Sequence, residues 1–208
     1  MQEAVELQVA EALRRGRFDE AASAGLRGYG PEILGFLIAL GPSTAEDAFS
    51  QFCEDLWRGL PGFRAQASFR TWAYTLARHA VVRVRRDPWS RRASPLSDLG
   101  PISGIAEELR SSTASFLAAR VRDRVTQLRD QLEEEDRALL VLRIDRQMAW
   151  GDIARVMVGA DAPDAEITKR SAALRKRFER LKLEIRERAE REGLVDKRPP
   201  SEKKPGRG

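Results

Sequence analysis

The stretch ITKRSAALRKRFERLKLEI, residues 167–185, decides the fold class of this chain. Its apolar and small residues recur in alternating steps of four and three, so in an α-helix they share one face. This row, the buried row, consists of Ile167, Ser171, Leu174, Phe178, Leu181 and Ile185. Opposite it stands the exposed row, made of Lys169, Ala172, Ala173, Lys176 and Arg180. The pattern predicts a helix with one buried face and one exposed, largely basic face.

A shorter helical segment precedes this one. The i, i+3, i+4, i+7 spacing of an amphipathic helix is met by Trp150, Ile153, Ala154 and Met157. A loop with Gly159 and Pro163 separates the two segments. A short helix, a turn and a longer basic helix form the helix-turn-helix arrangement, whose second helix enters the major groove of DNA. The alternative is an ordinary helical hairpin with a charged outer face.

Two further helices are predicted in the first half of the chain. A hydroxyl and acidic residues at 43–47 are typical of a helix start, and the buried face that follows consists of Phe49, Phe52, Cys53 and Leu56. We therefore interpret Cys53 as a core residue. The second helix starts near Ser68 and is expected to bury Phe69, Trp72, Leu76, Ala80 and Val84. Its opposite side would expose Arg70, Tyr74, Arg78 and Arg85.

Gly, Pro and Ser punctuate the chain at residues 28–31, 41–43, 61–62 and, at greatest length, 87–112. Because no stretch shows β-type alternation bounded by turns, the predicted fold class is all-α. We expect two small helical domains joined by a flexible linker, the second domain containing the helix-turn-helix. The expected boundaries are 1–90 for the first domain, 91–118 for the linker, 119–192 for the second domain and 193–208 for a basic, disordered tail.

Residue counts exclude several classes of function. With one cysteine and one histidine, the chain cannot form an internal disulfide or a cysteine-based zinc site, and it offers no nucleophile and base of the hydrolase type. We therefore expect no enzyme, no cofactor and no metal. The longest apolar run, residues 33–40, is far shorter than the roughly 20 residues that a membrane span needs. We expect a cytoplasmic protein without membrane contact.

Charge is distributed in blocks along the chain. Residues 1–60 and 133–166 each carry a net charge of −5, whereas residues 61–92 carry +7 and residues 167–208 carry +8. One interpretation is two nucleic-acid contacts, one in each domain, each joined to an acidic surface with another role. The other is solvated helix faces with a basic tail.

Four stretches of this sequence resemble extracytoplasmic-function sigma factors. AEDAFSQFCEDLW (45–57) resembles the region 2.2 helix, and FRAQASFRTWAYTLAR (63–78) resembles regions 2.3 and 2.4. WGDIARVM (150–157) and ITKRSAALRKRF (167–178) resemble the two helices of the region 4 helix-turn-helix. The order of the stretches and the intervening linker agree with the family. The departures are His79 where Asn is common, Arg83 where Asp is common, and a longer turn from Val158 to Glu166.

The resemblance implies an alternative sigma factor that binds core RNA polymerase, directs it to promoter DNA and helps open the promoter. The implied partners are the clamp coiled coil of the largest polymerase subunit, the flap of the second subunit, promoter DNA and an anti-sigma factor. The implied polymerase-binding residues are Asp47, Gln51, Glu54 and Asp55. Carboxylates and an amide on one helix face suit a basic partner helix.

The resemblance also implies two DNA contacts. The loop from Pro61 to Ser68 would capture a base flipped out of the non-template strand, with Tyr74 as a stacking residue and Trp72 in the core rather than stacking. The residues implied at the −10 element are Arg64, Gln66, Ser68, Arg70, Tyr74, Arg78, His79, Arg83 and Arg86. Those implied at the −35 element are Thr168, Lys169, Arg170, Ala172, Arg175 and Lys176.

Two other interpretations stay open. The chain could be a helix-turn-helix regulator that binds DNA alone, with residues 1–90 as a sensing or dimerising domain. It could also be a sigma-like adaptor that binds polymerase without recognising a promoter, which His79, Arg83 and the longer turn favour.

Overall fold

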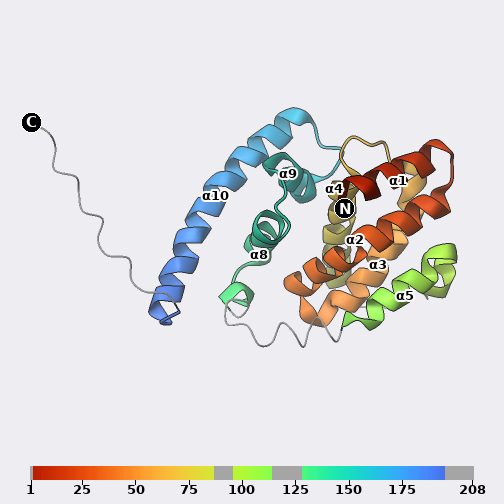
Figure 1. Cartoon of the computed structure of the whole chain (residues 1–208). Helices are drawn as coiled ribbons and strands as arrows, with labels where there is room; N and C mark the ends of the chain where they lie inside the picture. Colours follow the sequence, from red (N-terminus) through yellow and green to blue (C-terminus); the bar gives the residue numbers. More distant parts are fainter. Residues whose placement is uncertain (1, 87–95, 114–127, 195–208) are drawn as a thin grey trace, which may run out of the picture.

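The computed structural model describes residues 2–86, 96–113 and 128–194 (Figure 1). Helices account for the secondary structure of these residues, and no strand occurs among them. The all-α prediction is therefore confirmed. None of the helices in the described ranges is long and apolar enough to cross a membrane.

The N-terminal helices pack around α2. This group comprises α1 (Gln2–Arg14), α2 (Phe18–Leu40), α3 (Ala45–Gly59) and α4 (Phe69–Arg86), and α2 contacts the other three. The core between them includes Phe36, Phe49 and Phe52, each at most 1% exposed. Cys53 is also buried, as predicted, and burial raises the pKa of its thiol.

The glycines and proline at 28–31 do not interrupt the chain as the sequence suggested, because Pro31 lies inside α2. Small residues are needed here for close packing. A Cβ atom at Gly25 would lie 2.3 Å from the ring of Phe69, and one at Gly30 would lie 2.4 Å from Leu109. These glycines let α4 and a later helix approach the backbone of α2 closely.

Part of the predicted linker is folded. Residues Leu96–Ile102 form the short helical segment η3, and Ser103–Ser111 form α5, which packs against α2 and α3. The buried side chains of this segment are Leu99, Ile102, Ile105 and Ala106. They recur at near-helical spacing, but glycine, proline and serine between them obscured the pattern in the sequence. Residues 91–95 and 114–118 of the predicted linker, and most of the predicted tail, lie outside the described residues.

The C-terminal helices form the predicted short helix, turn and long helix. They are α8 (Glu134–Leu140), the π-helical turn η4 (Val141–Asp145), α9 (Trp150–Val158) and α10 (Asp164–Arg191). The turn between α9 and α10 is shorter than expected, because α10 starts at Asp164. The Arg155 guanidinium closes this turn by donating to the Ala160 carbonyl (3.2 Å) and to Asp164 (2.9 Å).

The buried row of α10 has the predicted phase. Its members from Ile167 to Leu181 are buried, and Ile185 is half-buried. The rings of Trp150 and Phe178 meet edge to face with centroids 5.5 Å apart, and the Ser171 hydroxyl donates to the Trp150 carbonyl at 3.1 Å. These contacts fix α10 on α9.

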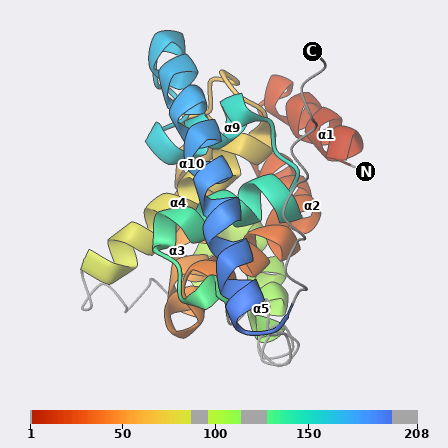
Figure 2. The same ribbon diagram turned by 90° about the vertical axis from the view of Figure 1, so that its left-hand side faces the viewer.

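The two helical groups touch each other. Helix α9 packs against α4 and α8 against α2, whereas α10 lies on the outer side (Figures 1 and 2). Much of this contact is polar. The Arg137 guanidinium donates to the Leu40 carbonyl (3.2 Å), and the Arg146 guanidinium donates to the Glu32 carbonyl (3.1 Å).

Replacing Leu174 by alanine should destabilise the C-terminal helices, because it empties a buried position in the middle of the row that holds α10 on α9. We expect Leu174→Ala to lower the free energy of unfolding by about 2–5 kcal/mol. Lys176→Ala, two residues along on the exposed row, should leave stability within about 0.5 kcal/mol. Denaturant melting of both variants measures this, and the opposite order would disprove the assigned helix phase.

Candidate nucleic-acid interface

The acidic side of α3 is less exposed than the sequence predicted. Gln51 and Glu54 are only 8% and 9% exposed, and Asp47 in the first turn is partly exposed. The Gln51 amide donates to Asp55 at 3.1 Å, and Asp55 also pairs with Arg83 of α4 at 2.7 Å. The sequence predicts different partners for Asp55 and Arg83, polymerase and DNA, but in the structure the two residues neutralise each other.

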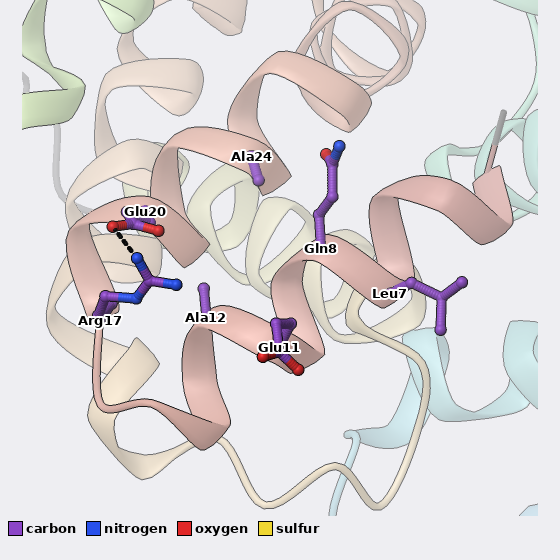
Figure 3. A pocket seen from close by; sticks show the side chains of 7 residues that line it. All are labelled: Leu7, Gln8, Glu11, Ala12, Arg17, Glu20 and Ala24. Atoms are coloured by element: carbon purple, nitrogen blue, oxygen red, sulfur yellow. Dashed lines mark hydrogen bonds and ion pairs between the residues drawn. The ribbon is translucent and has the colours of Figure 1, made fainter.

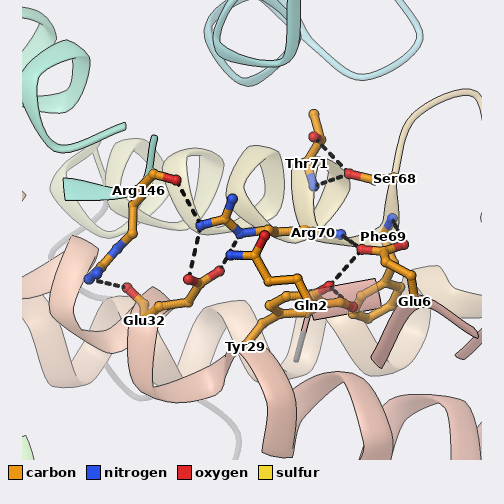
Figure 4. A network of polar contacts seen from close by, with 9 residues as sticks. All are labelled: Gln2, Glu6, Tyr29, Glu32, Ser68, Phe69, Arg70, Thr71 and Arg146. Atoms are coloured by element: carbon orange, nitrogen blue, oxygen red, sulfur yellow. Dashed lines mark hydrogen bonds and ion pairs between the residues drawn. The ribbon is translucent and has the colours of Figure 1, made fainter. Parts of the chain in front are cut away.

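The start of α4 is capped by two elements at once. The Ser68 hydroxyl accepts from the Thr71 amide (3.1 Å), as expected of an N-cap. The Glu6 carboxylate of α1 accepts from the amides of Phe69 and Arg70, both at 2.9 Å (Figure 4). Sequence reasoning missed Glu6, because it lies more than 60 residues from the helix it caps and has no local signature.

The loop before α4 forms one wall of a pocket. Between this loop and α1 lies a hollow of about 390 Å³, lined by Glu6, Val9, Ala10, Leu13, Arg14, Phe63, Arg64, Ala65, Ala67 and Phe69. Arg64 and Gln66 are exposed here, as predicted. Trp72 is half-buried and packs on Phe63, with ring centroids 4.9 Å apart. The expectation that Trp72 lies wholly in the core is thus only partly met.

The structure contradicts the prediction that Tyr74 is an exposed stacking residue. Its side chain is fully buried and meets Phe36 edge to face, with centroids 5.2 Å apart. Arg70 is also mostly enclosed, because it forms a two-pronged pair with Glu32 (2.7 and 3.0 Å) and donates to the Arg146 carbonyl (3.2 Å) (Figure 4). The predicted phase failed because α4 is packed on several sides, by α2, α3 and α9.

Arg78 lies under the C-terminal helices. It is half-buried, and burial lowers the pKa of its guanidinium, although the charge of Glu135 opposes this. Farther along α4, Arg85 is exposed, as predicted, and so are His79, Arg83 and Arg86, which the resemblance implies at the −10 element. The pKa of His79 is lowered, first by partial desolvation and then by the charge of Arg78, which favours the neutral ring at pH 7. The accessible positive charge of α4 therefore gathers at its C-terminal end.

The exposed row of α10 faces away from the rest of the chain. Residues Thr168, Lys169, Ala172, Arg175 and Lys176 are all exposed, as predicted. Arg170 differs, because it forms an ion pair with Glu135 of α8 and is only partly exposed. The two alanines of the row leave room for close approach of a DNA groove, and the lysines flank them with positive charge.

The acidic first turn of α8 binds arginines of two other helices. Glu134 pairs with Arg85 of α4, and Glu135 pairs with Arg170 and Arg177 of α10. Asp136 also pairs with Arg177, at 2.5 Å. These three residues of the second acidic block therefore serve as internal counter-charges rather than as a separate surface.

Two larger hollows also lie on the described surface. One, of about 450 Å³, lies between α1 and α2 beside the ion pair of Arg17 and Glu20 (2.7 Å) (Figure 3). The other, of about 630 Å³, is largely apolar and lies between η4 and the C-terminal half of α10. Leu183 and Ile144 in this groove are 63% and 47% exposed. In the described part of the chain, no group of three or more potential metal ligands comes together.

Comparisons with known proteins agree with this arrangement. The family model of Sigma-70 region 2 matches residues 26–91, which run from α2 past the end of α4. RNA polymerase sigma-H factor of Pseudomonas aeruginosa is 28% identical over 136 residues, covering 62% of this chain and 70% of that protein. RNA polymerase sigma factor YlaC of Bacillus subtilis is 25% identical over 136 residues, covering 63% and 76%. No solved structure gives a significant match.

The residues that match Sigma-70 region 2 include α3, with its acidic side, and α4, with its arginines. The similarity to each of the two relatives covers 136 residues and is therefore longer than this match. Residues 26–91 of this chain therefore match Sigma-70 region 2, and over 136 residues the chain is similar to two RNA polymerase sigma factors.

Proposed function

We propose that this chain binds core RNA polymerase, directs it to promoters and helps open the DNA at the start of transcription. The match of residues 26–91 to Sigma-70 region 2 carries this proposal, and the two similar proteins are named RNA polymerase sigma factors. The geometry supports it, since the basic exposed row of α10 and the basic end of α4 give each helical group its own surface for DNA.

The polymerase contact that we propose is centred on α3. Asp47 is accessible, whereas Gln51, Glu54 and Asp55 are held in place by neighbouring side chains. A pre-arranged acidic face suits the basic clamp coiled coil, where charge complementarity sets orientation and association rate. The apolar groove at Ile144 and Leu183 is a suitable binding site for the flap of the second polymerase subunit. It lies beyond the exposed row of α10, so a flap bound there leaves that row free to contact DNA.

Reversing the charge of Asp47 should weaken binding to core polymerase. We expect Asp47→Arg to raise the Kd for core enzyme by about tenfold or more, because it places a cation against a basic partner. Glu46→Arg, a neighbouring exposed carboxylate pointing elsewhere on α3, is the matched control and should change the Kd little. The affinity of each variant for core polymerase is measured by fluorescence. Equal effects of the two substitutions would show that α3 is not the polymerase contact.

Removing Lys169 and Lys176 together should weaken −35 binding by the holoenzyme without changing its assembly. Each lost phosphate contact should reduce the slope of log affinity against log salt by about 0.9. The matched control is the double variant Arg188→Ala and Arg191→Ala, at the other end of α10. Titrations at several salt concentrations decide this, and an unchanged slope would rule out phosphate contacts by the two lysines.

We further propose that the two helical groups must separate before α4 can bind the −10 element. Arg70 and Arg78 are enclosed, and polar atoms without a partner among the described residues gather at the contact: Tyr74 Oη and the Nε atoms of Arg78, Arg137, Arg146 and Arg170. Opening would return these groups to water, so the contact can be exchanged for polymerase and DNA at low cost.

Arg146→Ala should favour the open form, because it removes the hydrogen bond to the Glu32 carbonyl of α2. We expect the free protein to bind a single-stranded −10 oligonucleotide about three to ten times more tightly. Small-angle scattering should show a larger radius of gyration. Arg143→Ala is the control, since Arg143 contacts Met148 and Trp150 of its own group. Tighter binding by the control alone would contradict an opening step.

The main rival function is that of a regulator that binds DNA without polymerase. Run-off transcription with purified core enzyme on a genomic fragment library separates the two. Promoter-dependent transcripts that require the chain support the sigma-factor function. DNA binding by the chain alone, with no transcript and no association with core enzyme, supports the regulator.

A further inference from the structure

We infer that Glu6 of α1 is a positioning residue for promoter opening, because it holds the start of α4 and the preceding loop in the geometry that receives a flipped base. This inference rests on the proposed sigma-factor function, in which the loop from Pro61 to Ser68 captures that base. Glu6 would not touch the DNA itself; it would act through the backbone of Phe69 and Arg70.

Two side chains accept hydrogen bonds from the free amides in the first turn of α4. The Glu6 carboxylate accepts hydrogen bonds from the amides of Phe69 and Arg70, one on each oxygen. The Ser68 hydroxyl accepts a hydrogen bond from the amide of Thr71. The Trp72 amide makes the first intrahelical bond, to the Ser68 carbonyl at 3.1 Å. A carboxylate at a helix N-terminus is also favoured by the helix dipole. Glu6 is therefore bound tightly to this turn although it belongs to another helix.

Glu6 is itself held in place. The Tyr29 hydroxyl donates to Glu6 Oε1 at 2.8 Å, and the Gln2 carbonyl oxygen lies 3.2 Å from the same hydroxyl oxygen (Figure 4). The pKa of Tyr29 is raised, first by burial and then by its hydrogen bond to Glu6, so the hydroxyl keeps its proton and remains a donor. Oε1 thus accepts from both α2 and α4, and the carboxylate links three helices at one point.

The loop depends on this anchor. It contains Ala65 at φ 53°, a left-handed conformation that an alanine adopts only when its surroundings enforce it. The loop meets α1 across the pocket lined by Arg64 and Phe63, and Phe63 packs on Phe69 and Trp72 in the first turn of α4, with ring centroids 5.9 and 4.9 Å apart. Releasing the carboxylate would free the first turn of α4 and let the exposed Arg64 and Gln66 leave the position that a displaced base requires.

The first experiment tests the geometry without polymerase. Amide hydrogen exchange is measured by NMR on the full chain, for wild type, Glu6→Gln and Glu11→Gln. Glu11 lies on the same helix and pairs with Arg14 and Arg15, so it is the matched control. We expect exchange at Phe69 and Arg70 to rise about tenfold in Glu6→Gln only. Unchanged exchange at these two amides would overturn the inference.

The second experiment separates positioning from general loss of fold. Promoter opening is followed by permanganate reactivity with holoenzyme on a promoter that wild type selects from a fragment library. A series of abasic templates first identifies the position at which wild type loses a base contact. On the intact template Glu6→Gln should open about tenfold less promoter than wild type, with unchanged affinity for core enzyme. On the abasic template the two proteins should be equal, because the contact that Glu6 supports is absent.

The outcomes are distinct. A tenfold defect on both templates would mean that Glu6 serves only the fold, and the inference would be lost. No defect on the intact template would also remove it. If wild type itself selects no promoter, the proposed sigma-factor function fails and takes the role in opening with it, whereas the exchange experiment still reports whether Glu6 holds the first turn of α4.

Discussion

The packing of α4 against α2 is the contact on which the rest of the structure depends. The ring of Phe69 lies where Gly25 leaves no side chain, and Tyr29 stacks beside that ring with centroids 6.1 Å apart. One turn farther along, Phe36 meets Tyr74. This apolar contact sets the depth and rotation of α4, and with them the position of the loop before it and of the basic residues at its end.

Several arginines around this apolar contact form ion pairs with carboxylates of the same chain. Arginines that the sequence offers as DNA ligands are divided into those with a carboxylate partner, such as Arg70, Arg83 and Arg170, and those exposed without one of the described carboxylates beside them, such as Arg64 and Arg175. The paired arginines can reach phosphates only by exchanging one anion for another. Such an exchange is close to balanced in free energy, which suits a protein that has to change partners.

The contact between the two helical groups has the same character. Besides apolar packing between α4 and α9, it joins guanidinium groups to backbone carbonyls and leaves several polar atoms without partners among the described residues. In the proposed opening, the helices within each group are expected to stay together. This division fits the proposed function, in which the two helical groups bind separate promoter elements.

The sequence by itself determined the all-α class, the phase of α10 and the core position of Cys53, because these follow from periodicity within a single helix. It also pointed to the sigma-70 family through motifs of continuous sequence. Only the tertiary structure decided that Tyr74 is buried, that Asp55 and Arg83 are paired, and that part of the predicted linker forms α5. The capping of α4 by Glu6 was likewise decided only by the tertiary structure. Each of these depends on which surfaces of different helices meet, and a helix packed on several sides carries no single polar face for a periodic pattern to reveal.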